Sequence, residues 1–260
     1  MQAVYETIFS FSGGHNFLNG QVCREFRDML ERVHPLLYVD TLLADGKKLN
    51  FSPSRRLAKA AFRMNLLYLL RENKKFIEGN ICARAAGEGK LEILKWAAGE
   101  GHNTREVCKR AAHNGYLEVL QWARANGCSW DEETCSNAAF SGHLEVLQWV
   151  RSQGCPWDEK TCSYIARSGR LKILQWARSQ GCPWDEKTCS NAALAGHLQV
   201  LQWARSQGCP WNEGTCSNAA HKGHLEVLQW ARSMNCPWDK AVCLWCAQSY
   251  PEIRQWIEKN

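Results

Sequence analysis

A period of 27 residues restricts what this chain can fold into more than any other feature of its sequence. Five tryptophans follow one another at this spacing: Trp122, Trp149, Trp176, Trp203 and Trp230. Four other series share the step and have five members each, from Gly115 to Gly223, Cys128 to Cys236, Trp130 to Trp238 and Cys135 to Cys243. A fixed period of this length is typical of repeat proteins, in which every repeat is one small supersecondary unit.

Each copy of the unit predicts two short helices. The copy that starts at Cys182 reads CPWDEKTCSNAALAGHLQVLQWARSQG. The capping residues of WDEKT predict the start of the first helix, and Gly196 predicts its end because glycine readily adopts the left-handed conformation. The second helix, HLQVLQWARSQ, ends at Gly208. It is amphipathic, and its predicted apolar face carries Leu198, Leu201, Trp203 and Ala204.

A pair of helices this small cannot bury its apolar surface alone, so the copies must stack into an all-α solenoid. Residues 80–101 fit the unit, and the degenerate copy SRRLAKAAFRMNLLYLLREN precedes them. At the other end PEIRQWIEKN matches the second helix, with Arg254 where a buried Leu is expected, as in a polar terminal cap. We therefore divide the chain into a small helical module (1–35), a connector with a degenerate first repeat (36–79), and the repeats with their cap (80–260).

The segment TCSNAALAGHLQVLQWARSQGC resembles the ankyrin pattern of Thr-Pro-Leu-His, Ala-Ala, Gly-His, an aliphatic run and Gly-Ala. Ankyrin repeats usually have 33 residues, and the six missing residues fall between the second helix and the next first helix. The resemblance therefore implies a helix-turn-helix solenoid that lacks most of the β-hairpin fingers. The ankyrin Pro is Cys in the later copies and the ankyrin His is Asn137, Asn191, Asn218 or Tyr164, so the resemblance does not extend to the hydrogen bonds of that His.

This short form is similar to ankyrin proteins that are abundant in giant DNA viruses and in some algae and oomycetes. The start of the chain lacks the pattern of a signal peptide, and no stretch has the roughly 18 consecutive apolar residues of a membrane span. We expect a cytoplasmic or nuclear protein, in a host cell if it is viral, with its fourteen cysteines as thiols. Between Lys47 and Lys75 nine basic residues face one acid, Glu72. We read this stretch as a solvated surface, because no nucleic-acid motif accompanies it.

Repeated cysteines and histidines raise the alternative of a metal or redox protein, which the spacing disfavours. Equivalent cysteines of stacked helices lie about 8–10 Å apart, too far to share an ion that each thiolate approaches to about 2.3 Å. Within one unit Cys189 and His197 are roughly 12 Å apart along the helix. Only Cys243 and Cys246 form a close pair. We predict buried thiols, no metal and no cofactor, and no enzyme, since no catalytic set appears.

The tryptophans and the Gly-His steps are predicted to be framework residues, which pack the repeats together and do not bind a partner. The regular spacing places one Trp on each second helix and one in each connector, where burial is more plausible than a platform for stacking bases. Trp176 is predicted to occupy the place of a buried ankyrin Leu. His143, His197 and His224 recur at the turn between helices, where we expect capping and packing.

Positions that differ between copies and face outward are the candidates for binding a protein target. The pair of residues before each inter-helix Gly is different in each copy. In the copy with Arg167, this pair lies close in sequence to Tyr164 and Arg170. Aromatic and Arg side chains are enriched at interaction hot spots. We predict a partner-binding stripe on a monomer, the alternative being neutral drift at exposed helix ends. Its residues are His113, Phe140, Tyr164, Arg167, Arg170, Leu194 and His221.

Residues 1–35 do not follow the repeat. The run VCREFRDML from Val22, with IFSF upstream, resembles the second half of the F-box, Val-Cys-Arg-x-Trp-Arg, although Phe26 replaces the Trp and the leading Leu-Pro is absent. The resemblance implies a substrate receptor in which Ile8, Phe9, Val22 and Phe26 contact the linker subunit of a cullin ubiquitin ligase. The alternatives are an amphipathic helical cap on the solenoid, and a plain scaffold or host-interaction protein with no ubiquitin link.

Overall fold

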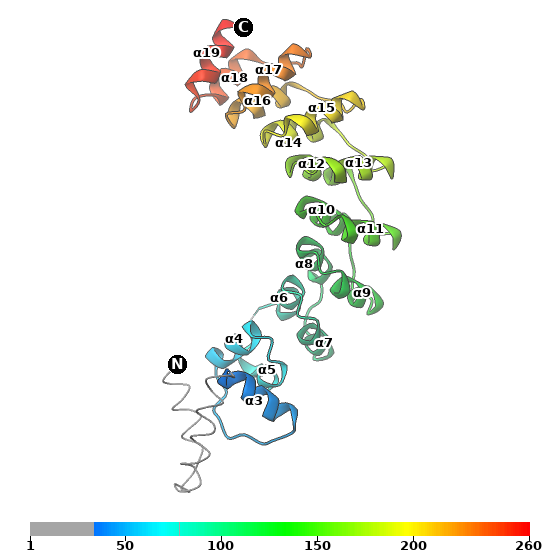
Figure 1. Ribbon diagram of the computed structural model, residues 1–260, viewed down its shortest axis with the longest axis vertical. Helices are drawn as coiled ribbons and strands as arrows, with labels where there is room; N and C mark the ends of the chain where they lie inside the picture. Colours follow the sequence, from blue (N-terminus) through cyan, green and yellow to red (C-terminus); the bar gives the residue numbers. More distant parts are fainter. Residues whose placement is uncertain (1–33, 78) are drawn as a thin grey trace. The chain divides into compact units, whose positions relative to one another are not determined.

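The computed structural model describes residues 34–77 and 79–260 of the chain. Every regular element in this part is helical, and none is a strand (Figure 1). None of these helices is both long and apolar enough to cross a membrane. The chain divides into two compact units, unit 1 (residues 1–85 and 90–103) and unit 2 (residues 86–89 and 104–260). The F-box-like contact residues lie outside the described residues: Ile8, Phe9, Val22 and Phe26.

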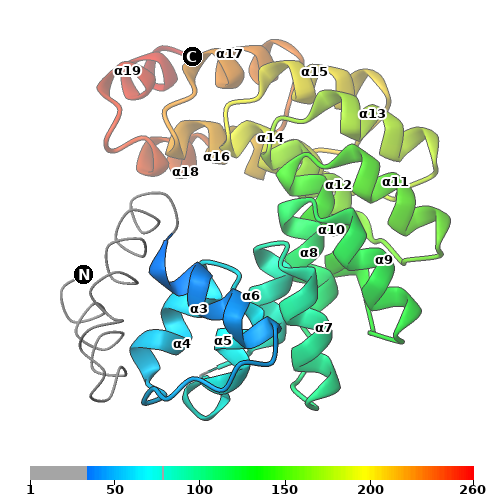
Figure 2. The same cartoon turned by 60° about the horizontal axis from the view of Figure 1, so that its bottom comes forward.

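Unit 1 contains a helix pair that corresponds to the predicted degenerate repeat. Its elements are α3 (Pro35–Ala44), α4 (Arg55–Arg63), α5 (Leu67–Glu72), the 3-10 helix η1 (Lys74–Phe76), most of α6 (Ile81–Gly87) and α7 (Leu91–Gly99). Both α3 and α4 pack against α5 (Figure 2). The buried Asn73 joins the start of α4 to the end of α5, because its amide accepts from the N–H of Ser54 and donates to the carbonyl of Leu69.

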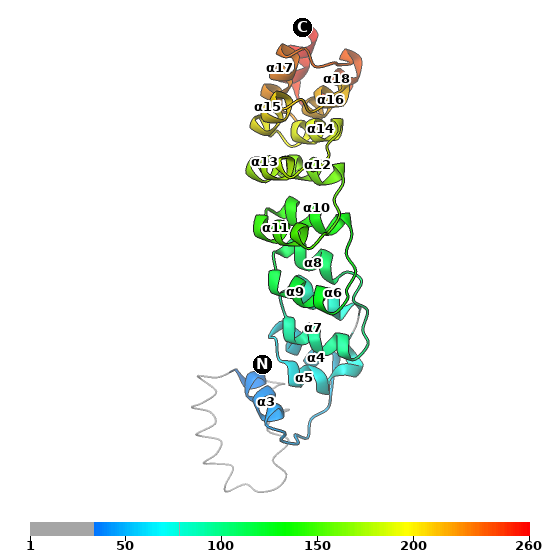
Figure 3. The same cartoon turned by 90° about the vertical axis from the view of Figure 1, so that its right-hand side faces the viewer.

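Unit 2 is a stack of helix pairs. The first helices of the pairs are α8 (Val107–Asn114), α10 (Glu132–Ser141), α12 (Glu159–Arg167), α14 (Glu186–Leu194), α16 (Glu213–His221) and α18 (Lys240–Cys246). The second helices are α9 (Leu117–Ala125), α11 (Leu144–Ser152), α13 (Leu171–Ser179), α15 (Leu198–Ser206), α17 (Leu225–Ser233) and α19 (Pro251–Lys259). Each first helix packs against the next one, and the second helices form a parallel row beside them (Figures 1 and 3).

Local sequence signals set the ends of these helices. Asp185 caps α14 by accepting from the backbone N–H of Lys187 at 3.1 Å. Gly196 follows α14 in the left-handed region, with φ +76°. The N–H of the next residue returns to the carbonyl of Ala192, and this bond closes the helix end. Gly208 ends α15 with φ +80°. The predicted helix pair is confirmed.

The core of unit 2 lies between the two rows. The largest buried side chain of each second helix in the regular copies is a leucine: Leu120, Leu147, Leu174, Leu201 and Leu228. First helices contribute small residues such as Ala192 and Cys189, which allow neighbouring helices to approach closely. In α15 the buried set is Val200, Leu201 and Ala204, whereas Leu198 and Trp203 of the predicted apolar face are only half-buried. The periodicity predicts which face of the helix points to the core, but it does not predict how deeply each residue of that face is buried.

The last second helix, α19, replaces an apolar contact by a polar one. Ile253 is buried, as its counterpart Val227 is, but Arg254 is exposed and lies 3.7 Å from Glu258 in an ion pair. The preceding copy has the fully buried Leu228 at the position of Arg254. This substitution removes the apolar surface that Leu228 buries one repeat earlier.

Candidate functional site

The connector side of unit 2 repeats one arrangement of Arg and Trp in every copy. Trp184 meets Trp203 edge to face, with ring centroids 6.0 Å apart. The guanidinium carbon of Arg178 lies 3.9 Å from the centroid of the Trp184 ring, and its Nη1 donates to the carbonyl of Cys182. The pair of rings and the guanidinium group over the first ring recur as Arg124, Trp130 and Trp149; Arg151, Trp157 and Trp176; Arg205, Trp211 and Trp230; and Arg232, Trp238 and Trp256.

These tryptophans are framework residues, and the predicted burial of Trp176 is only partial. Trp176 is half-buried, and Leu174 two positions earlier is the fully buried residue of α13. The indole contacts Trp157 edge to face at 6.0 Å, and part of it remains in contact with solvent. A ring pair capped by a guanidinium therefore closes each connector from outside, while the aliphatic side chains fill the core.

The cysteines join each first helix to the connector that follows its partner helix. The thiol of Cys189 donates to the carbonyl of Cys209 at 3.9 Å, and the thiol of Cys209 donates to the carbonyl of Asp185 at 3.5 Å. Cys135 with Cys155 and Cys162 with Cys182 repeat the first contact. Comparison of cysteines within one unit, or at equivalent places in successive units, misses this pairing across 20 positions.

The thiols of Cys108 and Cys243 are held in the protonated form. All described cysteines are free, and all but Cys246 are buried. Burial raises the pKa of the Cys108 thiol to about 12 and that of Cys243 to about 11, so both remain protonated near pH 7. Within the described residues, no group of three or more His, Cys, Asp or Glu side chains is arranged to hold a metal ion. A protonated, buried thiol is a poor nucleophile and a poor metal ligand.

The turn residue of each copy covers the glycine of the copy before it. A Cβ atom at Gly196 would lie 2.6 Å from the ring of His224, so this position needs glycine both for its positive φ and for the space. Equivalent contacts are His143 on Gly115, Arg170 on Gly142 and His197 on Gly169. The histidines of the Gly-His steps therefore serve packing, as predicted.

A groove of about 580 Å³ lies along the first helices α10 and α12. One end of the groove, at the start of these helices, is lined by Asp131, Glu132, Glu133, Asp158 and Lys160. The other end, where the helices finish, is lined by His113, Phe140, Tyr164 and Arg167. The two ends thus differ in chemistry.

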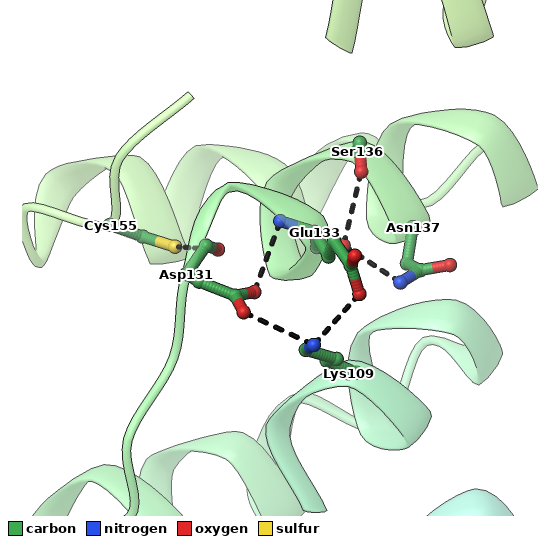
Figure 4. A network of polar contacts seen from close by, with 6 residues as sticks. All are labelled: Lys109, Asp131, Glu133, Ser136, Asn137 and Cys155. Carbon is green, nitrogen blue, oxygen red and sulfur yellow. Dashed lines mark hydrogen bonds and ion pairs between the residues drawn. The ribbon is translucent and has the colours of Figure 1, made fainter. Parts of the chain in front are cut away.

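Lys109 balances much of the charge at the acidic end. Its Nζ lies 3.1 Å from Asp131 and 2.7 Å from Glu133 (Figure 4). These two carboxylates raise the pKa of Lys109, which therefore stays charged. Ser136 and Asn137 donate to the carbonyl of Glu133. The network holds the first turn of α10 in place.

The other end carries an exposed aromatic pair. Phe140 and Tyr164 meet edge to face with ring centroids 6.4 Å apart, and each residue is 39% exposed. At the position of Tyr164 the neighbouring copies have Asn137, Asn191 and Asn218. Asn218 uses its amide to donate to the carbonyl of Ser190 in the preceding copy at 3.2 Å. Tyr164 instead presents its ring to the groove.

The structure brings together four of the seven residues predicted to contact a partner, namely His113, Phe140, Tyr164 and Arg167. Leu194 on α14 and His221 on α16 lie on the same row of first helices but outside the groove lining. Arg170 lies in the turn after α12, over Gly142, with its Nη2 3.4 Å from the carbonyl of Ser141. Partner binding by all seven remains a prediction.

Trp245 was missed by the sequence analysis. It is 69% exposed, the largest exposure among the large hydrophobic side chains of the described residues. It stands in α18 where the preceding copies carry Asn218 and Asn191, outside the two series of framework tryptophans. A comparison of copies that includes α18 identifies it. It is easily overlooked in the sequence because so many other Trp residues belong to the repeat.

Comparisons with known proteins bear on the fold alone. No protein-family model matches the chain, and no curated protein matches its sequence. Among solved structures, the ankyrin repeat domain of human ASB11 is similar, with a TM-score of 0.52 and 13% sequence identity. The likeness covers 68% of this chain and 96% of that domain. It confirms the predicted fold class, an all-α solenoid of the ankyrin type.

Proposed function

We propose that unit 2 is a non-enzymatic protein-binding module, and that its site is the groove on α10 and α12. The observation that carries this proposal is the exposed pair of Phe140 and Tyr164 inside a groove of about 580 Å³. Aromatic side chains in pockets of this size are typical anchors for a bound partner. Both rings stand at positions that change from copy to copy, so stacking of the repeats does not require them.

The size of the groove favours a short extended segment of the partner. From Glu133 to Phe140 the axis of α10 advances seven residues, about 10 Å at 1.5 Å per residue. An extended chain advances about 3.3 Å per residue, so three or four residues occupy this length. One side chain of the partner would then pack on the aromatic pair. Together with the residues next to it in the partner, it would supply most of the contact.

The test uses the full chain and a random library of twelve-residue peptides. Peptides selected on the wild-type chain are measured again on the double variant Phe140→Leu and Tyr164→Asn, which takes residues found in sister copies and should fold normally. Loss of two hot-spot side chains should weaken binding by at least about tenfold. Trp245→Asn, which also replaces an exposed aromatic residue by the residue of sister copies but lies outside the groove lining, serves as the control. Unchanged affinity in the double variant, with unchanged stability in urea, would show that the groove is not the site.

A link to a ubiquitin ligase rests on the F-box-like run alone. In this second proposal, residues 1–35 dock the linker subunit of a cullin ubiquitin ligase while the groove holds the target. Co-purification with that linker subunit, abolished by Val22→Asp with Phe26→Asp, is the expected result. Retention of the linker subunit by the double variant would leave the plain scaffold, acting as a monomer in the cytoplasm or nucleus, as the better account.

A further inference from the structure

We propose that the segment held by the groove is acidic: a carboxylate beside its apolar anchor pairs with Arg167 and Arg170 while the anchor packs on Phe140 and Tyr164. This inference rests on the proposed function and adds the chemistry of the partner. Both arginines are exposed residues: Arg167 lines the aromatic end of the groove, and Arg170 lies in the turn that follows α12. Arg is the cation best suited to bind a carboxylate through two hydrogen bonds.

The repeat formed by α12 and α13 differs in charge from its neighbours. From Lys160 to Trp184 the chain has five basic residues and no acidic one. The matching stretch of the next copy, from Lys187 to Trp211, also has no acidic residue but only two basic ones. One of these, Lys172, takes the place of an acid, because the equivalent residues in other copies are Glu118, Glu145, Gln199 and Glu226. The central repeat has therefore lost the carboxylate that would repel an acidic partner near Arg170.

The cations at this end have no ion-pair partner within the described part of the chain. No ion pair there involves Arg167, Arg170 or Lys172. Lys109, in contrast, is held by two carboxylates, and Arg178 lies flat on Trp184. Arg170 is also positioned in advance, because it packs over a glycine and lies within hydrogen-bond distance of the carbonyl of Ser141. A bound carboxylate would meet an oriented guanidinium group.

The four acids of the groove lie at its opposite end, where Lys109 and Lys160 balance two of their four charges. Asp131 and Glu133 share Lys109, and Asp158 lies 4.0 Å from the amino group of Lys160. Glu132 is the remaining acid of the lining. It precedes Phe140 by eight residues, about 12 Å along α10, which exceeds the Debye length of about 8 Å at physiological salt. The uncompensated charge beside the aromatic pair is therefore positive.

A nucleic acid fits this end less well than an acidic protein segment. The carbonyl ends of α10 and α12 point here, and the partial negative charge of a helix C-terminus opposes any anion. It opposes a closely spaced row of phosphates more than a single carboxylate that is paired with Arg167 or Arg170. The two arginines lie beside two half-exposed aromatic rings, a combination that suits one or two carboxylates next to an apolar side chain. Leu194, at the position of Arg167 in the next copy, interrupts the line of cations.

The peptide library on the full chain also tests this inference. We expect the selected peptides to carry Asp or Glu within two residues of an aromatic or long aliphatic side chain. The variant Arg167→Leu with Arg170→His, which has the residues that α14 and its turn carry as Leu194 and His197, should bind such a peptide about tenfold more weakly. The control Arg110→Asn with Lys222→Ser also removes two positive charges by taking sister residues, and should leave the affinity unchanged.

The outcomes separate the two proposals. Selected peptides that depend on Tyr164 but lack acidic residues, or carry Lys and Arg, would overturn the acidic partner and leave the groove as the binding site. A twelve-nucleotide thymidine strand that displaces the acidic peptide as well as unlabelled peptide does would also overturn it, in favour of general polyanion binding. If no selected peptide depends on Tyr164, the proposed function itself fails.

Discussion

The connector side of unit 2 and the outward face of its first helices differ in how closely their copies match. On the connector side every regular copy has the same Arg, the same two Trp and a buried Cys, and their contacts recur at nearly constant distances. On the outward face the equivalent residues are His113, Phe140, Arg167, Leu194 and His221. Identical interfaces between repeats require identical residues, whereas a single binding site requires a departure from the repeat. The Trp and Cys residues of the connector side, although these residue types are rare in most proteins, therefore belong to the framework.

Alkaline pH should affect the framework most strongly. The folded state raises the pKa of Cys108 to about 12, while the thiol of the unfolded chain titrates near 9.0. Between these values the unfolded state loses the proton and the folded state keeps it. Stability is therefore complete below pH 9 and falls as the pH rises toward 12, by about 1.4 kcal/mol per pH unit for one such thiol.

Urea unfolding from pH 7 to 11 measures this loss. The variant Cys108→Ala isolates the thiol from lysines and tyrosines that titrate in the same range, and its free energy of unfolding should fall less steeply with pH than that of the wild type. Cys246→Ala is the control, because Cys246 is not fully buried. Parallel pH profiles for wild type and Cys108→Ala would mean that this thiol is not held protonated by burial.

Replacement of two tryptophans, one of the framework and one of the outward face, should change the stability by very different amounts. Trp203 is half-buried and contacts Trp184 edge to face, so Trp203→Ala should lower the free energy of unfolding by about 2–3 kcal/mol, less than for a fully buried Trp. Trp245 is 69% exposed, and Trp245→Asn, which takes the residue of the sister copies, should change it by no more than about 0.5 kcal/mol. Denaturant midpoints of the two variants provide the comparison, and equal losses would contradict the division into framework and outward face.

The period and its capping residues were enough to predict the helix pairs. Asp185 and Gly196 mark the ends of α14 because a cap and a left-handed glycine act locally, within a few residues. The depth of Trp203 and the contact between Cys189 and Cys209 were not predictable in this way. They depend on how far a second helix is inserted and on which connector passes the first helix, and neither is a local property.

The candidate site was predictable in part for the same reason. Comparison of copies identified Phe140, Tyr164 and Arg167, since any position that breaks the repeat is visible in a single sequence. It could not show that their side chains share one groove, because this depends on the spacing of α10 and α12. Arg170 was placed in the same stripe, yet its packing on Gly142 follows only from the stacking of successive turns.

Replacement by alanine of the glycine between the helices of a repeat, Gly196, and of the glycine between repeats, Gly208, should cost different amounts of stability. The expected difference is smaller than that between the two tryptophans. Gly196 and Gly208 both have positive φ, but a Cβ at Gly208 would meet nothing within 4 Å, whereas one at Gly196 would collide with the His224 ring. Gly208→Ala should cost about 1–2 kcal/mol from backbone strain alone. Gly196→Ala should cost about 1 kcal/mol more, the scale of a side chain forced from its rotamer.

Denaturant unfolding of both glycine variants, and of Gly196→Ala combined with His224→Ala, distinguishes strain from collision. The double variant should lose less stability than the sum of the two single changes, because removal of the ring makes room for the new methyl group. Additive losses would indicate that His224 does not cover Gly196 in solution.

The smallest expected effect compares two arginines that a net-charge count treats alike. Arg178→Lys removes a planar group that stacks on Trp184 and donates to the carbonyl of Cys182, so stability should fall by about 0.5–1 kcal/mol. Arg167→Lys keeps the charge at an exposed position with no ion pair among the described residues, so stability should not change measurably. Peptide binding should show the reverse order, weakened by Arg167→Lys because a lysine cannot bind a carboxylate in the bidentate manner, and unaffected by Arg178→Lys. Equal effects of both variants on binding would mean that the groove responds to overall positive charge rather than to the guanidinium group beside its aromatic pair.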